Sequence, residues 1–160
     1  MKKLKITTAY IRYNNLDELD DSERHLMDSA IKARKKAYAP YSHFNVGAAV
    51  LLNNGKVVTG SNQENAAYPS GMCAERVAVF SAGATYPNAS ILKIAISARS
   101  TLKQVHEPVA PCGACRQTIA EYEFKQETPI EMLFMGETGD IIKVESLKSL
   151  LPLGFDKSFL

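Results

Sequence analysis

Three cysteines and one glutamate form the part of this sequence with the clearest chemical meaning. Cys73-Ala74-Glu75 holds the first thiol, Pro111-Cys112-Gly113-Ala114-Cys115 holds the other two, and the chain has no further cysteine. A small, odd number of cysteines that includes a C-x-x-C pair suits a reduced chain and a metal ion better than a disulfide framework. Three thiolates can bind Zn²⁺ and leave a fourth tetrahedral position open, which is typical of a catalytic zinc site.

Glu75 lies two residues after the first thiol, so its carboxylate is predicted beside the metal rather than on it. Zinc lowers the pKa of a bound water toward neutrality, and Glu75 is therefore predicted to move the protons of that water. The order of these residues resembles the zinc deaminases, in which a His or Cys ligand is followed by x-Glu and later by Pro-Cys-x-x-Cys.

Two other interpretations of the cysteines remain open. One is a closed structural site with a fourth protein ligand, for which His43 and His106 are the candidates, and the other is a set of buried cysteines without metal. A C-x-x-C pair alone would be weak evidence. The addition of Cys73 to this pair, with Glu75 two residues later, favours the open zinc site.

Both cysteine segments are predicted at the starts of helices, over residues 74–82 and 113–122. Helix N-termini carry free N–H groups and partial positive charge, which stabilise thiolates and offset the net negative charge of three of them around one Zn²⁺. Arg76 lies three residues after Cys73, one helical turn away on the same face. It is predicted to hydrogen-bond a zinc thiolate.

The remaining elements predict an α/β fold. A strand pair around the turn at 53–55 reads as a hairpin, and strands then alternate with helices, which indicates a three-layer α/β/α arrangement around a mixed five-stranded sheet. Residues 6–13 fit either a short strand or a disordered arm. Pro40 is predicted to end the first helix. The predicted strands are 46–52, 56–61, 91–98, 129–135 and 140–144, and the predicted helices are 22–38, 74–82, 113–122 and 146–150.

The composition limits the possible partners. The 160 residues are predicted to form a single domain over 1–160, with 1–21 as an N-terminal extension of unknown role. A net charge of +2 gives little reason to expect a nucleic-acid or membrane partner. No apolar run approaches the roughly 20 residues of a membrane span, and no signal peptide is expected. Free thiols fit a reducing cytoplasm.

The whole set of motifs resembles the small homotetrameric zinc-dependent cytidine deaminases of pyrimidine salvage, over roughly residues 22–156. The resemblance rests on motifs that occur in the same order along the chain. They are Tyr38-Ala39-Pro40-Tyr41-Ser42-His43-Phe44, Val46-Gly47-Ala48-Ala49, Asn62-Gln63-Glu64-Asn65-Ala66, Cys73-Ala74-Glu75-Arg76, Pro111-Cys112-Gly113-Ala114-Cys115-Arg116-Gln117 and Leu150-Leu151-Pro152.

This resemblance implies hydrolytic deamination of cytidine and 2′-deoxycytidine to the uridines, with one zinc ion per subunit, in a homotetramer. It implies that Cys73, Cys112 and Cys115 are the zinc ligands and that Glu75 is the proton shuttle. The substrate contacts that it implies are Phe44 against the base, Asn62 and Glu64 at a ribose hydroxyl, the amide near Ala74 at the pyrimidine or the zinc-bound hydroxide, and Tyr68 and Phe155 near or within a neighbouring subunit's site.

Three alternatives compete with this function. A deaminase of another aminopyrimidine nucleoside, such as blasticidin S, would use the same metal site. A nucleic-acid editor would need a basic groove for a flipped or single-stranded base, which the net charge of +2 does not favour. A zinc-stabilised scaffold would unfold without metal and turn over no substrate.

Overall fold

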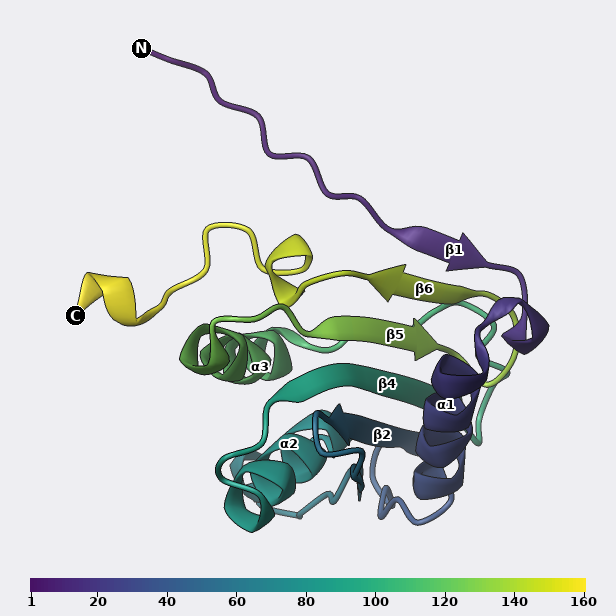
Figure 1. Cartoon of the computed structure of the whole chain (residues 1–160). Helices are drawn as coiled ribbons and strands as arrows, with labels where there is room; N and C mark the ends of the chain where they lie inside the picture. Colours follow the sequence, from purple (N-terminus) through teal and green to yellow (C-terminus); the bar gives the residue numbers. More distant parts are fainter.

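A six-stranded mixed sheet forms the middle layer of the molecule (Figure 1). The structure is a computed structural model that describes residues 1–160. The strand order is β1-β6-β5-β4-β2-β3, in which β4 and β5 are parallel and every other neighbouring pair is antiparallel. The strands are β1 (Ile11–Tyr13), β2 (Phe44–Leu52), β3 (Val57–Ser61), β4 (Ile91–Ser100), β5 (Glu131–Met135) and β6 (Ile141–Val144), and the helices are α1 (Asp21–Arg34), α2 (Ala74–Thr85) and α3 (Gly113–Gln126).

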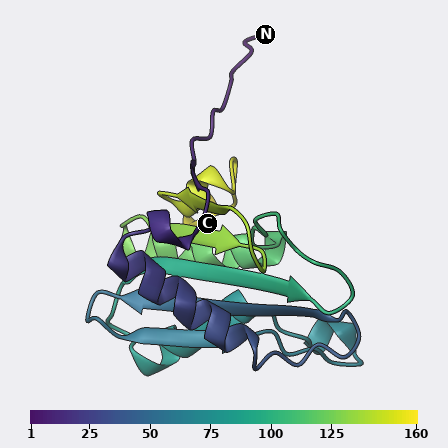
Figure 2. The ribbon, with the colours of Figure 1, turned by 90° about the vertical axis from the view of Figure 1, so that its right-hand side faces the viewer.

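Helices cover both faces of the sheet, as predicted. Figure 2 shows α1 lying across one face, while α2 and α3 lie on the other. Alternate residues of each strand point to opposite faces, so Ala49 of β2 packs under α1 whereas Ala48 and Val50 pack under α2 and α3. The result is two apolar clusters, one on each side of the sheet.

Two glycines let helices approach the sheet closely. A Cβ atom at Gly47 of β2 would lie 2.1 Å from the Ala30 carbonyl oxygen of α1, and one at Gly60 of β3 would lie 2.5 Å from the Ala74 carbonyl oxygen of α2. No side chain fits at either position. The first turn of α2, which carries Glu75, therefore rests directly on the sheet.

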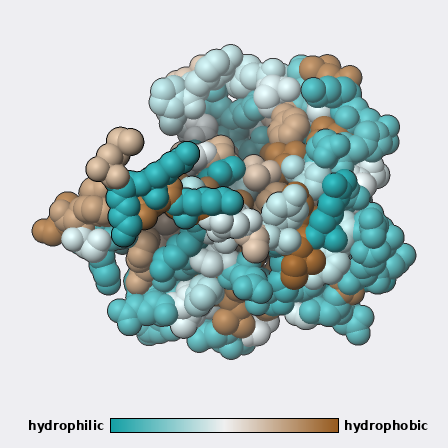
Figure 3. All heavy atoms as spheres, turned by 90° about the horizontal axis from the view of Figure 1, so that it is seen from above, coloured by the Kyte–Doolittle hydropathy of each residue, from teal (hydrophilic) through white to brown (hydrophobic).

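The sheet has six strands rather than the predicted five. The sixth is β1, which lies in the segment predicted as a strand or a disordered arm and pairs with β6 in the register Ile11 to Lys143 and Tyr13 to Ile141. The chain before β1 is exposed: the Thr8 hydroxyl donates to Ser149 O at 3.1 Å, and the N-terminal end projects from the body of the molecule (Figure 1). Seen from that side, the surface is mainly hydrophilic, with hydrophobic atoms in separate patches (Figure 3).

The helix boundaries also differ from the prediction. α1 ends at Arg34 rather than at residue 38, well before Pro40. The backbone of Tyr38 pairs with another segment instead: its N–H donates to Asn62 O, and its carbonyl accepts from Glu64 N, both at 2.9 Å. α2 and α3 continue to Thr85 and Gln126, beyond their predicted ends. No helix is long and apolar enough to cross a membrane.

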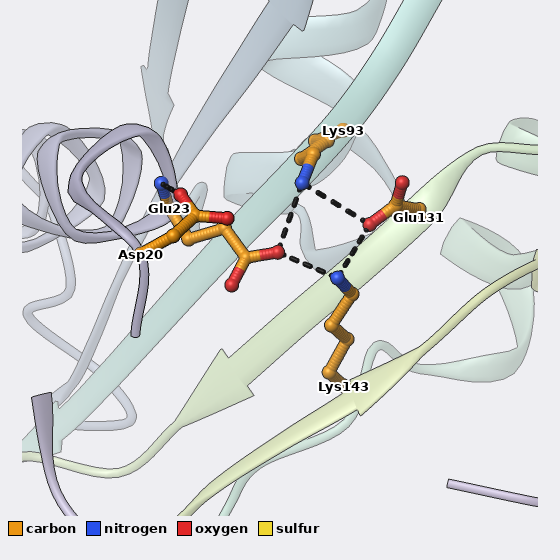
Figure 4. Close-up of polar contacts among 5 residues, drawn as sticks. All are labelled: Asp20, Glu23, Lys93, Glu131 and Lys143. Atoms are coloured by element: carbon orange, nitrogen blue, oxygen red, sulfur yellow. Dashed lines mark hydrogen bonds and ion pairs between the residues drawn. The ribbon is translucent and has the colours of Figure 1, made fainter. Parts of the chain in front are cut away.

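A buried ion-pair network fastens α1 to the sheet (Figure 4). Glu23 of α1 is only 2% exposed, and its Oε1 lies 2.9 Å from Lys93 Nζ of β4 and 2.6 Å from Lys143 Nζ of β6. Glu131 of β5 contacts the same two amines at 3.2 and 2.8 Å. Asp20 caps the helix by accepting from Glu23 N at 2.8 Å. Two carboxylates thus balance two ammonium groups where three strands meet the start of α1.

Glu23→Gln is expected to lower the free energy of unfolding by about 3 kcal/mol, because it leaves two partly buried ammonium groups short of negative charge. Urea unfolding followed by circular dichroism measures this change. Asp17→Asn is the matched control, since Asp17 pairs with Arg24 at the surface with its side chain 85% exposed, and should cost under about 1 kcal/mol. Equal effects of the two substitutions would contradict a stabilising role for the network.

Candidate active site

The three cysteine sulfurs lie together where α2 and α3 begin. Cys73 Sγ is 3.9 Å from Cys112 Sγ, Cys112 Sγ is 3.6 Å from Cys115 Sγ, and all three lie within 4.8 Å of one another. Zinc–sulfur bonds of about 2.3 Å at tetrahedral angles place sulfur atoms about 3.8 Å apart. The spacing of this group therefore suits one Zn²⁺ ion.

Helix N-termini surround this sulfur group. Cys73 is the N-cap of α2 and Cys112 is the N-cap of α3; both have extended backbone, and neither side chain caps its helix. Their sulfurs are thus free to turn toward Cys115, which is fully buried in the first turn of α3. The positive ends of two helix dipoles point at the position where three thiolates would gather.

Arg76 also contacts the sulfur group. Its Nη2 donates to Cys73 Sγ at 3.7 Å, as the helical spacing predicts. The neighbouring Cys115 thiol and the Arg76 guanidinium lower the pKa of Cys73 to about 5, whereas contact with Cys73, together with burial, raises the pKa of Cys115. Contact with the other thiol and with the guanidinium thus favours the thiolate form of Cys73.

Glu75 is buried beside the sulfurs, with 5% of its surface exposed. Burial raises the pKa of its carboxyl group, and the nearby Cys73 adds to this effect. A carboxyl group with a raised pKa can both accept and return a proton near neutral pH. It is thus suited to proton transfer next to a metal.

A cavity of about 420 Å³ opens onto the sulfur group and Glu75. Phe44 and Val46 from β2 and Ile96 from β4 are apolar lining residues, and Asn62 and Glu64 are polar ones. This volume lies within the range of small-molecule sites. The full lining is Ser42, Phe44, Val46, Asn62, Glu64, Cys73, Ala74, Glu75, Ile96, Val109, Ala110 and Cys112.

Asn62 and Glu64 are held by the segment that leads into β2. The Asn62 side chain accepts from Val46 N at 2.7 Å and donates to Phe44 O at 2.9 Å, which leaves one amide hydrogen free. Glu64 Oε2 accepts from Tyr41 N at 2.9 Å and from Ser42 N at 3.3 Å. Both side chains thus support the protein backbone as well as facing the cavity.

Two of the predicted substrate residues do not line this cavity. Tyr68 is 75% exposed and borders a neighbouring hollow of about 350 Å³, where its ring lies 6.0 Å from that of Tyr41. Phe155 is 57% exposed and stacks on Phe159 at 5.6 Å. Within one chain, neither ring reaches the sulfur group.

The two histidines considered as fourth ligands stay outside the sulfur group. His43 is exposed in the turn before β2, and His106 Nδ1 lies 3.0 Å from Thr138 Oγ1. The group therefore consists of three cysteines, and the closed site with a histidine ligand is not formed.

Five lining residues were not predicted as site residues: Ser42, Val46, Ile96, Val109 and Ala110. Val109 and Ala110 directly precede Pro111-Cys112, so their nearness to the metal ligands in sequence was an available signal. Ser42 belongs to the motif at residues 38–44, which supports the family resemblance but predicts no role for Ser42. Its role depends on Glu64, which is distant in sequence.

Arg116 links the cysteine segment to the C-terminal part of the chain. Its Nε donates to Pro111 O and its Nη1 donates to Leu150 O, both at 2.8 Å. The next residue, Gln117, donates to Phe155 O at 2.9 Å. The backbone before Cys112 is therefore fixed by a residue of α3 that also holds the chain after β6.

Comparison with known proteins agrees with this site. The family model for the cytidine and deoxycytidylate deaminase zinc-binding region matches residues 20–128. A cytidine deaminase of Halalkalibacterium halodurans is 41% identical over 130 residues, which cover 81% of this chain and 91% of that protein. One from Sporosarcina psychrophila is 39% identical over 137 residues, covering 86% of this chain and 93% of that protein.

Solved structures show the same fold. The crystal structure of cytidine deaminase from Burkholderia pseudomallei has a TM-score of 0.72 and 42% identity, covering 82% of this chain and 97% of that chain. Cytidine deaminase from Mycobacterium tuberculosis has a TM-score of 0.66 and 31% identity, covering 86% of this chain and 99% of that chain. The chain belongs to the cytidine and deoxycytidylate deaminase family.

Cys112→Ala is expected to weaken zinc binding by at least about a hundredfold, because two sulfurs cannot replace three at a tetrahedral ion. Competition with a coloured chelator measures the affinity, and atomic absorption should give one zinc ion per wild-type chain. Glu121→Ala, at an exposed position of α3 six residues after Cys115, should bind zinc as the wild type does. Full zinc affinity in Cys112→Ala would exclude this residue as a ligand.

Proposed function

We propose that this protein is a zinc-dependent cytidine deaminase, which hydrolyses cytidine and 2′-deoxycytidine to uridine and 2′-deoxyuridine and releases ammonia. The observation that carries the proposal is the cavity of about 420 Å³ in which a buried carboxyl group, Glu75, adjoins three convergent sulfurs. The named relatives and the family model point to the same reaction.

Cys73, Cys112 and Cys115 would hold the zinc ion, which acidifies water and polarises it for attack. Glu75 takes one proton from the attacking water and delivers it to N3 of the pyrimidine while the water oxygen bonds to C4. Glu75 then takes the second proton of that water from the oxygen on C4 and passes it to the 4-amino group, which leaves as ammonia when the C4–N bond breaks. Water and cytidine thus yield uridine and ammonia.

The cavity walls supply the substrate contacts in this proposal. The Phe44 ring packs on the pyrimidine, and the free N–H groups at the start of α2, including that of Ala74, donate to the base or to the attacking oxygen. The remaining amide hydrogen of Asn62 and the carboxylate of Glu64 bind a hydroxyl of the sugar. Arg76 steadies Cys73, since its guanidinium already donates to that sulfur at 3.7 Å.

A homotetramer completes the proposal. Four aromatic side chains are between 45% and 75% exposed: Tyr68, Phe80, Phe155 and Phe159. Exposed apolar surface of this kind is typical of contacts between subunits. In an assembly, Tyr68 and Phe155 would stand at or near a neighbouring subunit's cavity. The proposed setting is the cytoplasm, in salvage of pyrimidine nucleosides.

Glu75→Gln is expected to lower kcat for cytidine by at least about a thousandfold, because the amide cannot carry the proton between water, N3 and the amino group. The fall in ultraviolet absorbance and the release of ammonia both report turnover. Zinc content should stay at the wild-type value, since Glu75 is not one of the clustered sulfur ligands. Normal turnover by the variant would refute the proton-transfer role, and wild-type turnover of blasticidin S in place of cytidine would refute the substrate.

Sedimentation equilibrium is expected to give a mass four times the chain mass of 17.6 kDa. Phe155→Ala should lower kcat/KM for cytidine by about tenfold, because it removes an aromatic ring proposed to reach the neighbouring site. Leu102→Ala, which changes an exposed residue on the loop between β4 and α3, serves as the control. A fully active monomer would contradict the shared site.

A further inference from the structure

The turn before β2 wraps around a single carboxylate. Glu64 Oε2 accepts from the backbone N–H groups of Tyr41 and Ser42, and Oε1 accepts from the Ser42 hydroxyl. A carboxylate offers about four acceptor positions, so three donors from two adjacent residues leave about one position open. The rotation of the Glu64 side chain is therefore fixed by residues 41 and 42.

The direction of the Ser42 hydroxyl is also determined. Its oxygen accepts from Phe44 N at 3.1 Å, and its only proton goes to Glu64 Oε1. A hydroxyl that accepts from an amide becomes a better donor, so the two bonds strengthen each other. Ser42 thus connects the backbone of Phe44 to the Glu64 carboxylate, and all three residues line the cavity.

The backbone of this turn is shaped for that contact. His43 has a φ of 56°, in the left-handed region that a non-glycine residue seldom occupies. Its N–H donates to Ala39 O at 3.1 Å, and its carbonyl accepts from Thr101 N at 3.0 Å, so the conformation is held from both sides. Unfavourable backbone angles that are retained in this way occur often at functional sites.

Ser42 and Glu64 both line the cavity that holds Glu75. We propose that Ser42 is a positioning residue, which fixes the Glu64 carboxylate so that its open acceptor position receives a hydroxyl of the substrate's sugar. This inference rests on the proposed function and adds to it the group that sets sugar recognition. Ser42 itself does not touch the reacting atoms.

The electrostatics agree with this geometry. Although partial burial opposes it, donation from Ser42 and Tyr41 lowers the pKa of Glu64 below its ordinary value, and His43 is the nearby titratable group that adds to the effect. Glu64 is therefore ionised at neutral pH. An ionised carboxylate can only accept, which suits it to a sugar hydroxyl that donates.

Ser42→Ala is expected to raise KM for cytidine by roughly tenfold and to leave kcat within about twofold, since the lost bond orients a binding group and not the reacting atoms. For 2′,3′-dideoxycytidine, which lacks both sugar hydroxyls on the ring, kcat/KM should be unchanged. Ser42→Thr keeps the hydroxyl and should restore the KM for cytidine. A purely structural role for Ser42 would impair both substrates alike.

A double-mutant cycle with Glu64→Ala tests whether Ser42 acts through that carboxylate. The Ser42→Ala change should have almost no effect on KM once Glu64 is alanine, and additive effects would overturn the inference. Thermal unfolding and zinc content of each variant, compared with Ser81→Ala on the surface of α2, report any general damage.

A titration of the Glu64 carboxyl by carbon-13 NMR separates failure of this inference from failure of the proposed function. Loss of the Ser42 hydroxyl should raise the pKa of Glu64, whether or not the protein acts on cytidine. An unchanged pKa would show that Ser42 does not hold the carboxylate. Absence of wild-type cytidine turnover, with a raised pKa in Ser42→Ala, would instead refute the proposed function alone.

Discussion

The electrostatic repulsion among three clustered cysteine sulfurs is the constraint on which the rest of this structure depends. Sulfurs 3.6 to 3.9 Å apart, each able to carry a negative charge, need nearby positive potential. Two helix N-termini and the Arg76 guanidinium provide it. Each helix must therefore begin at its cysteine, and both must begin at the same place in space, although the two cysteine segments are far apart in the sequence.

The sheet meets this requirement through its strand order. β4 and β5 are the parallel pair at its centre, and the crossover between them contains α3. α2 packs beside α3 on the same face, and Gly60 lets its first turn lie against β3. α1 and the Glu23 network brace the opposite face. The rigid strands thus place the metal ligands and the cavity walls together.

Local patterns in the sequence predicted the elements that depend on local forces. The helix starts at Cys73 and Cys112, the β2–β3 hairpin and the helices on both faces follow from spacing, caps and turns. β1 was left undecided because its pairing partner lies more than a hundred residues later. The early end of α1 could not be predicted from residues 22–38, because it depends on hydrogen bonds between Tyr38 and both Asn62 and Glu64, which lie later in the chain.

Local sequence patterns also could not predict which carboxylates are buried. Glu23 looks like an ordinary residue of a solvated first helical turn, yet it is 2% exposed. Glu123 of α3 accepts from Ile130 N at 2.8 Å and from Leu147 N at 3.0 Å, deep in the protein. Their partners come from other segments, so only the assembled fold shows what these charges do.

The two bonds of Arg116 have a consequence for how this protein can change in evolution or by design. One guanidinium binds both Pro111 O and Leu150 O. The backbone before α3 and the backbone after β6 must therefore keep a fixed position relative to each other. The β5–β6 turn is tied to the loop that precedes Pro111, since Glu137 N donates to Val105 O at 2.7 Å, so length changes there would disturb that loop. A shift at residue 150 would be passed through Arg116 to Pro111 and the adjoining Cys112.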